Sequence, residues 1–530
     1  MRSCPSRTRR DFLRATALAT LSSALAAKAL RAAPSIGTDV RVYGATGNDN
    51  NSDTAAINAA IDATATKGGG IVRIPAGDYL CHTIHLRDGI TLYLERGAVL
   101  RAAPTGQYDP FQPNRWDRYQ DFGHSHWHNS MICGVGVKDV AIAGPGVICG
   151  DGLSRGEFSY ASARHGGADK IIALKECRNV SLSGFTLIGS PHIAILATGV
   201  NNLHVSRLLV DVGRDGIDID CCENVVVEDS AFNTPHDDSI VLKSSNALGY
   251  SRPTSNVQIR RCLVTGGFKP GTLVDGRRIA ICAADGMKAR IKIGTESCWG
   301  FDRVSVENCI IWNALGIPLL TVDGGALTHV SLRDIAMRNI QDAPLLLRLG
   351  SRLRAPEGAK VERFAGVTVE NLACDGFRMP VTIAGIPGHR ITDVTLRNIE
   401  LVRRAAPVPQ EGGGWIPLAA AFAGSDAVPP EKAGDYPEAG MFGPLPARFL
   451  FARHVENLAI DGLRLKSTVP AKALAAATTA SNAPLFWFDD IEGVRFADIH
   501  APDGAAGPIC NPNAPCHPSV TLSGTKTRVN

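Results

Sequence analysis

A short alternation of apolar and polar residues recurs along most of the chain. Each copy is a β-branched alternation, often preceded by Asn, with a second strand-like stretch three or four residues later. The copies are NVSLSGFTL (179–187), NLHVSRLLV (202–210), NVVVEDSAF (224–232), NVQIRRCLV (256–264), RVSVENCII (303–311), HVSLRDIAM (329–337), GVTVENLAC (366–374), DVTLRNIEL (393–401) and NLAIDGLRL (457–465). This period-2 pattern predicts short β-strands separated by Asn, Asp and Gly turns.

The spacing of the copies predicts a solenoid. Several neighbouring copies lie 22 to 27 residues apart, and the longer gaps fit one repeat with an inserted loop. A single copy is too short to bury its apolar face, so neighbours must stack. We therefore expect an all-β fold, a right-handed parallel β-helix. A propeller would need a longer, four-stranded repeat, and a β-sandwich would not keep this period over so long a stretch.

One segment has clear helical character and is expected to cap the solenoid. Residues 53–67 read DTAAINAAIDATATK, with Ile57 and Ile61 on one face. Asp53 is a suitable N-cap residue, and the three glycines that follow would stop the helix. Because a solenoid needs its open end covered, we expect this short helix to form the N-terminal cap.

The chain is expected to have three parts. Residues 1–33 carry a twin-arginine pair before an alanine-rich apolar stretch, which is typical of a twin-arginine export signal and too short to span a membrane. Residues 34–505 are expected to form a single β-helix catalytic domain, with 403–447 as a long loop, and 506–530 a C-terminal tail. The signal predicts a periplasmic or secreted protein.

The charge and the cysteines exclude some partners. Of 55 Lys/Arg and 51 Asp/Glu, seven basic residues and one acidic residue lie in 1–33, which leaves 48 positive and 50 negative groups. The nominal net charge therefore gives no reason to expect nucleic acid or membrane as a partner. The 14 cysteines include no C-x-x-C pair that would indicate zinc. We expect no cofactor and no metal; the oligomeric state stays open.

Acidic residues recur where two neighbouring repeats enter a strand, in GRDGIDID and HDDSIVLKS. Equivalent positions on adjacent rungs of a β-helix lie about 4.8 Å apart. Asp215 and Asp237 are 22 residues apart, one repeat, so we expect Asp215, Asp237 and Asp238 to cluster, with Asp218 and Asp220 nearby. Such a cluster suits a glycosidase, in which repulsion keeps one carboxyl protonated and the others activate water. Ordinary turn chemistry is the alternative.

These motifs resemble the core of glycoside hydrolase family 28, the polygalacturonase family. The resemblance spans roughly residues 40–400 and rests on VYGATGNDNNSDTAAINAAI (42–61), NSMICGVGVKDVAIAGPGVICGDG (129–152), SPHIAI (190–195), GRDGIDIDCCENVVVEDS (213–230) and HDDSIVLKSS (236–245). That family has a parallel β-helix and hydrolyses pectic polymers with inversion. The resemblance implies an exported glycoside hydrolase that cleaves an acidic pectic polysaccharide of the galacturonan or rhamnogalacturonan type.

The resemblance also implies catalytic roles. The family's Asn-Thr-Asp motif falls on Gly213-Arg214-Asp215, and its paired aspartates fall on Asp237-Asp238. Asp237 is then implied as the general acid, and Asp215 with Asp238 as the base that activates water. Repulsion from Asp215 is expected to keep Asp237 protonated.

The sequence departs from the family where substrate is bound. Phe268-Lys269 stand where the histidine of a Gly-His-Gly motif is expected. Arg290 and Lys292 have the letters of the family's Arg-Ile-Lys motif and share a strand face suited to a uronate carboxylate. Their context RIKIGTES, however, resembles the segment after that histidine. A cation pair on a solvated strand is the alternative.

We therefore expect a pectin-type specificity other than plain homogalacturonan, either for rhamnogalacturonan or for chain ends. The candidate substrate-binding residues are Arg214, which replaces a small residue of the family, and His236, Lys243, Arg290 and Lys292.

Two loop segments carry weaker signals. HSHWH places His124, His126 and His128 on one face if it is extended, a spacing that can hold a metal. Trp127 and the loop setting favour a substrate contact or a polar loop instead. The stretch 431–443 is expected, from its position alone, to form a wall of the groove.

Two rival functions remain. A β-helix polysaccharide lyase would use Arg290 or Lys292 to abstract a proton and would leave a product with an ultraviolet-absorbing unsaturated end. A non-catalytic carbohydrate-binding solenoid would bind without making new reducing ends. On that interpretation, the presence of all three aspartates of the family's motifs would be a coincidence.

Overall fold

A computed structural model describes most of the chain beyond the expected signal. Residues 38–530 fall into one compact unit. The predicted signal 1–33, the centre of the 403–447 loop and most of the expected tail lie outside the described residues. The described residues are 37–121, 123–155, 166–282, 285–404, 428–468, 484–501, 509–510 and 516–517.

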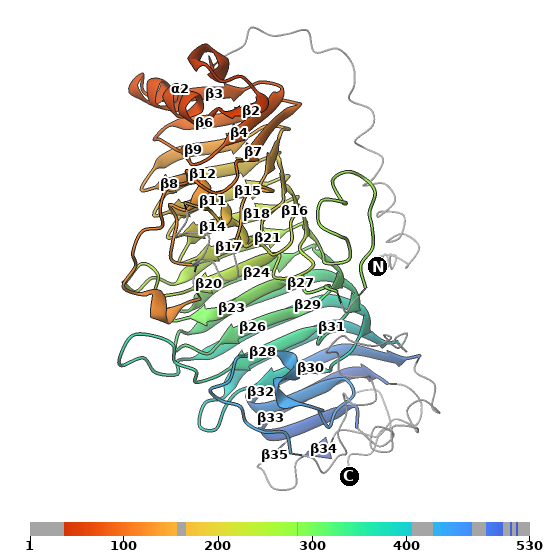
Figure 1. The fold of residues 1–530 in the computed structure, drawn as a ribbon. Coiled ribbons are helices and arrows are strands. Elements are labelled where there is room, and N and C mark those ends of the chain that lie inside the picture. The colour runs from red at the N-terminus through yellow and green to blue at the C-terminus, as the bar shows by residue number, and fades with distance from the viewer. Residues whose placement is uncertain are drawn as a thin grey trace, which may run out of the picture. The chain divides into compact units, whose positions relative to one another are not determined.

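The unit is a right-handed parallel β-helix, as predicted (Figure 1). Each coil of the chain contributes short strands, and each strand pairs in parallel with strands of the coils before and after it. The strands stack into three sheets, which we call sheets A, B and C. One face of every sheet points into the core of the coil and the other points outward, because side chains alternate along a strand.

Sheet A consists of β5 (Ile84–His85), β8 (Ser130–Val135), β11 (Lys170–Lys175), β14 (Ile193–Thr198), β17 (Asp215–Asp220), β20 (Ile240–Ser244), β23 (Ile291–Ser297), β26 (Ile317–Thr321), β28 (Leu345–Leu349), β30 (Val381–Ala384), the first part of β32 (Leu450–Ser467), the first part of β33 (Phe486–His500) and β34 (Ile509–Cys510).

Sheet B begins with β1 (Thr38–Asp39), β3 (Gly70–Ile74), β6 (Ile90–Leu94), β9 (Lys138–Ala143), β12 (Arg178–Ser183), β15 (Asn201–Ser206), β18 (Glu223–Glu228), β21 (Thr254–Arg260) and β24 (Phe301–Glu307). Sheet C begins with β2 (Asn48–Ser52), β4 (Gly77–Cys81), β7 (Ala98–Ala102), β10 (Val147–Cys149), β13 (Thr186–Ile188), β16 (Leu209–Asp211), β19 (Ala231–Asn233), β22 (Leu263–Thr265) and β25 (Ile310–Ala314).

Sheets B and C become continuous in the later coils. β27 (Leu327–Ile340) pairs with β24 through its first half and with β25 through its second half. β29 (Phe364–Phe377) and β31 (Ile391–Arg403) continue this long strand, and β32 and β33 follow. β34 and β35 (Cys516–His517) both pair with β33, so strand pairing extends past residue 505.

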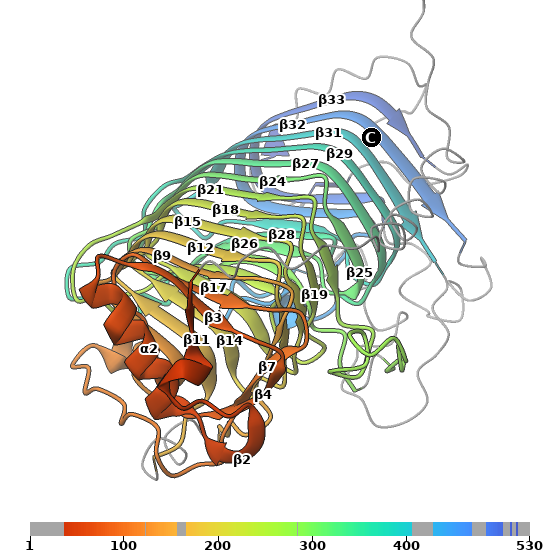
Figure 2. The same ribbon diagram turned by 90° about the horizontal axis from the view of Figure 1, so that it is seen from above.

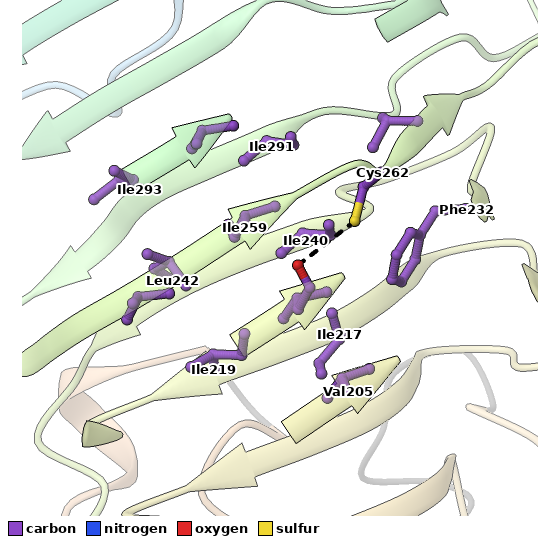
Figure 3. Packing of buried hydrophobic residues seen from close by; sticks show 14 of the residues in the cluster. Val205, Ile217, Ile219, Phe232, Ile240, Leu242, Ile259, Cys262, Ile291 and Ile293 are labelled. Atoms are coloured by element: carbon purple, nitrogen blue, oxygen red, sulfur yellow. Dashed lines mark hydrogen bonds between the residues drawn. The ribbon is translucent and has the colours of Figure 1, made fainter. Parts of the chain in front are cut away.

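Apolar side chains stack in columns inside the coil. Ile217, Ile240 and Ile291 are register partners on β17, β20 and β23. They are fully buried in one continuous core, part of which is shown in Figure 3. These inward columns fix the strands, and the residues that alternate with them, such as Asp218 and Lys292, must then point outward from sheet A.

The asparagine that often precedes the alternation has a structural reason. Asn179, Asn202, Asn224 and Asn256 all adopt positive φ, between 53° and 59°, at the turn into sheet B. Asn tolerates this left-handed conformation better than most residues. Their side-chain amides also form a ladder from coil to coil, with Nδ2–Oδ1 distances of 2.8, 3.2 and 2.6 Å.

The predicted cap is present as α2 (Thr54–Thr66), which lies at the N-terminal end of the coil (Figure 2). Ile57 and Ile61 are buried. The expected capping role of Asp53 is wrong in detail: its carboxylate accepts hydrogen bonds from the backbone N–H groups of Thr46 and Gly47 instead of capping the helix. Among the described residues, no helix is long and apolar enough to cross a membrane.

Candidate active site

The site lies on the outer face of sheet A, at β17, β20 and β23. The register pairs Ile217 with Ile240, which puts Asp215 level with Asp238 and Arg214 level with Asp237. The expected pairing of Asp215 with Asp237 was therefore wrong by one residue. The three carboxyl groups nonetheless lie together, with one oxygen of each within 4.8 Å of the others.

A cavity of about 310 Å³ opens over these carboxyl groups. This volume is near the lower end of the range for small-molecule sites. Three longer loops contribute lining residues: the β7–β8 loop (103–129), the described part of the β10–β11 loop with Arg155, and the described part of the β31–β32 loop (428–449). The β28–β29 loop (350–363) adjoins them through the contact of Arg354 with Asp121. The cavity is lined by Asp121, His124, Arg155, His192, Arg214, Asp215, Asp237, Asp238, Lys243, Lys292, Thr295, Glu296 and Tyr436.

Two cations hold Asp238. Arg290 Nε donates to Asp238 Oδ1, and Lys292 Nζ lies 2.9 Å from Asp238 Oδ2. Burial opposes the charge of Asp238, but the two cations outweigh it and keep the pKa of that carboxyl well below its usual range. Asp238 is therefore ionised, and Arg290 and Lys292, predicted to grip a substrate, are engaged with it in the structure.

Asp237 has a different partner and sits closer to solvent. Arg214 Nη2 donates to Asp237 Oδ2 in a salt bridge. The side chains of Arg214 and Asp237 are 33% and 26% exposed, respectively, whereas that of Asp238 is 4% exposed. Arg214 and Asp237 thus lie at the mouth of the cavity, and Asp238 lies on its floor.

Burial and repulsion act on Asp215, where we had not expected a raised pKa. Asp215 is buried, and its Oδ1 has no hydrogen-bond partner among the residues that the structure describes. Burial, and then the charges of Asp237, Asp218 and Asp238, raise the pKa of Asp215 well above its usual range. One physical reason is that, among the described residues, Asp215 has no cationic partner within hydrogen-bond distance, whereas Asp237 and Asp238 each have one or more.

A second charged cluster adjoins the trio toward the C-terminal ends of the strands. Lys243 Nζ lies 3.1 Å from Glu296 Oε2, 3.3 Å from His124 Nδ1 and 3.6 Å from Asp218 Oδ2. Burial would lower the pKa of Lys243, but Glu296 and the aspartates outweigh it and raise that pKa well above its usual range. Lys243 is therefore a fixed cation on the floor, as its prediction as a binding residue requires.

Sequence reasoning missed several residues of the site. His192 Nδ1 lies 2.8 Å from Asp169 Oδ2, and Lys170 Nζ lies 2.6 Å from Asp169 Oδ1. Burial, opposed by the bond to Asp169, lowers the pKa of His192 to about 4, so its imidazole is neutral at neutral pH. Two signals were available: His192 belongs to the SPHIAI motif, and Glu296 lies four residues after Lys292 on β23.

Of the remaining predicted residues, some line the cavity and others do not. Tyr436, from the stretch expected to form a wall, does line the cavity, and its hydroxyl lies 3.0 Å from Thr295 Oγ1. His236 is exposed and is not a lining residue. At the position of the absent histidine, Phe268 packs edge-on against Trp312.

Candidate cation ligands occur within the site, but protein cations stand next to them. Ligand atoms of His124, Asp215 and Asp218 lie within 4.8 Å of one another, as do those of the aspartate trio. Lys243 adjoins the first group, and Arg290 and Lys292 adjoin the second. The three histidines of HSHWH do not converge, because His126 contacts Asp117 and the Gln112 carbonyl instead.

Comparisons with known proteins agree with this architecture. Residues 72–269 match the model of glycosyl hydrolases family 28, and residues 37–103 match that of rhamnogalacturonase A/epimerase, pectate lyase-like. A probable polygalacturonase of Vitis vinifera is 24% identical over 393 residues, which cover 69% of this chain and 75% of that protein.

Two solved structures share the fold. The family 28 exopolygalacturonase of Yersinia enterocolitica superposes with a TM-score of 0.60 at 17% identity, covering 89% of this chain and 80% of that one. The exopolygalacturonase of Thermotoga maritima gives a TM-score of 0.56 at 19% identity, covering 70% and 88%. The family model and the polygalacturonase relative support membership of glycosyl hydrolase family 28 and indicate a polygalacturonase-like glycoside hydrolase, and the two solved structures show that the chain has the same fold.

Proposed function

We propose that the protein hydrolyses glycosidic bonds of an acidic pectic polysaccharide, of the galacturonan or rhamnogalacturonan type, through Asp215, Asp237 and Asp238. The observation that carries this proposal is the cavity over the carboxylate trio, with arginine and lysine side chains at its mouth and on its floor. Carboxylates supply the acid and base of glycoside hydrolysis. The cations offer partners for the carboxylates of a uronate chain.

The proposed division of labour follows the contacts of each aspartate. Asp238, held ionised by Arg290 and Lys292, accepts the proton of the attacking water, and the water oxygen attacks the anomeric carbon. Asp215 stands beside Asp238 and holds that water by a hydrogen bond. Asp237 donates its proton to the glycosidic oxygen as the bond to that oxygen breaks. The sum is one water added across the bond, with one proton taken up and one released.

Arg214 sets a condition for this mechanism. In the structure Arg214 Nη2 contacts Asp237 Oδ2, so Arg214 must move away before that oxygen can reach the glycosidic oxygen of a substrate. We infer that a uronate carboxylate of the substrate takes over Arg214. Substrates without that carboxylate, such as methyl-esterified chains, would then be poor substrates even if they reach the site.

The contacts argue against a lyase. Burial would lower the pKa of Lys292 and of Arg290, but Asp238 outweighs it and raises both above their usual values. A proton-abstracting base must be unprotonated, so neither residue suits that role.

The test is to incubate the protein with polygalacturonate and with rhamnogalacturonan, and to measure new reducing ends and ultraviolet absorbance. We expect reducing ends without absorbance, and a loss of about 10²–10⁴-fold in rate for Asp237→Asn, the usual contribution of a general acid. Asp498→Asn, at an exposed position outside the site, is the matched control and should keep the wild-type rate. Near-normal turnover of Asp237→Asn, or no cleavage of either polymer by the wild type, would contradict the proposal.

Inversion is a further part of the proposal. Inverting glycosidases typically separate their two carboxyl groups by about 6.5–9.5 Å, whereas oxygens of the trio lie within 4.8 Å. Inversion therefore rests on family membership and not on this spacing. Proton NMR of the first-formed product decides it: an anomer opposite to that of the cleaved bond supports inversion, and the same anomer contradicts it.

We also propose export through the twin-arginine pathway, on the strength of the N-terminal motif alone. Fractionation of cells that express the full chain should place the protein in the periplasm or the medium. Replacing Arg9 and Arg10 by lysine should keep it inside.

A further inference from the structure

The outer face of sheet A is covered on both sides of the site along the coil axis. Toward the N-terminus, Trp127 of the β7–β8 loop packs on the outer side chains of β11 and β14. The cluster is closed from solvent and consists of Trp127, Ala173, Ile193, Leu196 and Ala247. An extended polymer bound on the face of β17 therefore cannot continue onto the face of β14.

Toward the C-terminus a second segment covers the same face. Residues 439–447, which begin with η4 (Ala439–Phe442), lie across β28 and β30 in Figure 1. They pack on outward side chains of five strands in a cluster separate from the interior core. Its members on the sheet are Leu320, Leu346, Ala384, Phe451 and Trp487, and its members on the covering segment are Ala439, Phe442, Leu445 and Ala447.

A salt bridge closes a third side, at the C-terminal ends of the strands. Arg354 Nη1 of the β28–β29 loop lies 2.7 Å from Asp121 Oδ1 of the β7–β8 loop. The two loops arise from coils on opposite sides of the catalytic strands. Arg354 Nη2 also lies 3.1 Å from Glu296 Oε1, which ties the bridge to β23.

The space beneath this bridge is filled. His124, Lys243 and Glu296 are 6%, 4% and 2% exposed, respectively, and they contact one another. A chain cannot thread under the Asp121–Arg354 bridge and leave on the far side. The cavity is thus a pocket with a back wall and not a groove.

The mouth is at the N-terminal ends of the strands, where, of the described residues, Arg155, Arg214 and Asp237 line the cavity. There Asp237, the most exposed aspartate of the trio, stands with Arg214, and exposed His236 lies beside Asp237 in sequence. A general acid acts on the leaving group. If Asp237 is the acid, the leaving polymer lies outside the mouth, and the sugar that is cut off lies inside.

We propose that the protein acts on chain ends and releases one product of fixed, small size, with Asp121 and Arg354 setting where the bound end stops. This inference rests on the proposed function, because it concerns the same site and the same polymers. Action on chain ends is one of the two specificities that the sequence led us to expect.

The experiment uses the full chain with whichever of polygalacturonate and rhamnogalacturonan it cleaves. Products are sized from the first minutes onward, and viscosity is followed in the same reaction. We expect one small product from the start, with viscosity falling only after much of the polymer is consumed. A ladder of intermediate oligosaccharides with an early fall in viscosity would overturn action on chain ends and leave the proposed function intact. No cleavage of either polymer would contradict the proposed function itself.

The wall is tested with Asp121→Ala and Arg354→Ala. Both should raise the share of the next longer product, because the bound end can then extend past the bridge. Arg390→Ala breaks a salt bridge with Asp490 outside the site and should leave the product distribution unchanged. A distribution in Asp121→Ala and Arg354→Ala equal to that of Arg390→Ala would overturn their role as the wall. Melting curves confirm that all three variants are folded.

Discussion

The outward side chains of sheet A differ between the catalytic strands and the strands on either side of them. One column of these side chains, followed from strand to strand, shows the difference. The column runs through register partners Ala173, Leu196, Asp218, Val241 and Lys292, and then through register partners Pro318, Leu346, Thr382, Phe451 and Trp487. The adjacent pair Ile293 and Leu319 places Lys292 level with Pro318. Under the two covering segments its members are mostly apolar. At the catalytic strands, Asp218 and Lys292 bring charges to the same column.

This difference between apolar and charged side chains explains why a regular coil has a pocket at one place. Strand geometry is the same along the column, so covering depends on side-chain chemistry. Apolar positions such as Leu196 and Phe451 gain free energy when Trp127 or Phe442 removes them from water. Charged positions can be covered only when hydrogen-bond partners are buried with them, as Asp489 is with Arg453 at 2.8 Å and as backbone carbonyls are with Arg348. The catalytic strands carry more charged side chains than the loops can pair with partners of opposite charge. The loops therefore leave this part of the face uncovered, and a pocket remains.

The largest expected effect is on the N-terminal cover. Trp127→Ala should lower the free energy of unfolding by about 3–5 kcal/mol, the usual cost of removing a large buried aromatic side chain. Trp116→Ala, on the same loop but only half-buried, is the matched control and should cost clearly less. Denaturant unfolding measures both. Equal losses would show that Trp127 does not anchor the loop.

Next in size is the loss of one partner from a buried ion pair. Asp238→Ala leaves Arg290 and Lys292 without their anion, and Asp489→Ala does the same to Arg453. Each should cost about 3–5 kcal/mol, but only Asp238→Ala should abolish hydrolysis. The cations lower the pKa of Asp238 in the folded protein. The ion pairs of Asp238 therefore stabilise the fold fully at a pH above the carboxyl pKa of the unfolded chain. This stabilisation is lost as the pH falls from that value through the lower pKa of the folded state.

Activity lost equally in both variants would contradict this separation of stability from catalysis. The assay must be run where both variants are folded, as judged by circular dichroism.

A smaller effect of opposite sign is expected at Asp215. Because the folded-state pKa is raised, this carboxyl destabilises the fold as the pH rises above the unfolded value of about 3.9. Asp215→Asn should therefore raise the melting temperature at neutral pH while it abolishes hydrolysis. The gain should shrink toward about pH 4, where the unfolded chain also keeps its proton. A gain that is the same across that range would refute the assignment.

The smallest effect on stability is expected at the salt bridge of the wall. Asp121 and Arg354 are 57% and 27% exposed, and bridges of this kind contribute about 0–1 kcal/mol. Asp121→Ala should therefore unfold almost as the wild type does, although its products change. A loss as large as that of Trp127→Ala would mean that the bridge holds the loop and does not merely shape the pocket.

The sequence was sufficient to predict the coil and the cluster of carboxylates. Period-2 alternation is a local property, and it determined the parallel β-helix, the strand positions and the outward direction of Asp218 and Lys292. The cap was also predictable, because Ile57 and Ile61 form an apolar stripe at helical spacing. The closeness of Asp215 to Asp237 and Asp238 followed from the repeat, although the register differed by one residue.

What the sequence could not supply was the pairing of charges and the closure of the pocket. The partners Arg214 with Asp237, and Arg354 with Asp121, lie on different coils, and loop paths are not encoded in any repeat.

The sequence by itself therefore determined which residues face outward on which rung, since that depends on alternation alone. Only the tertiary structure decided that Asp215 carries the raised pKa, that Arg290 and Lys292 serve Asp238, and that the face is closed on both sides. The physical reason is that pKa values and access depend on distances between groups far apart in the chain, and those distances exist only once the loops have packed.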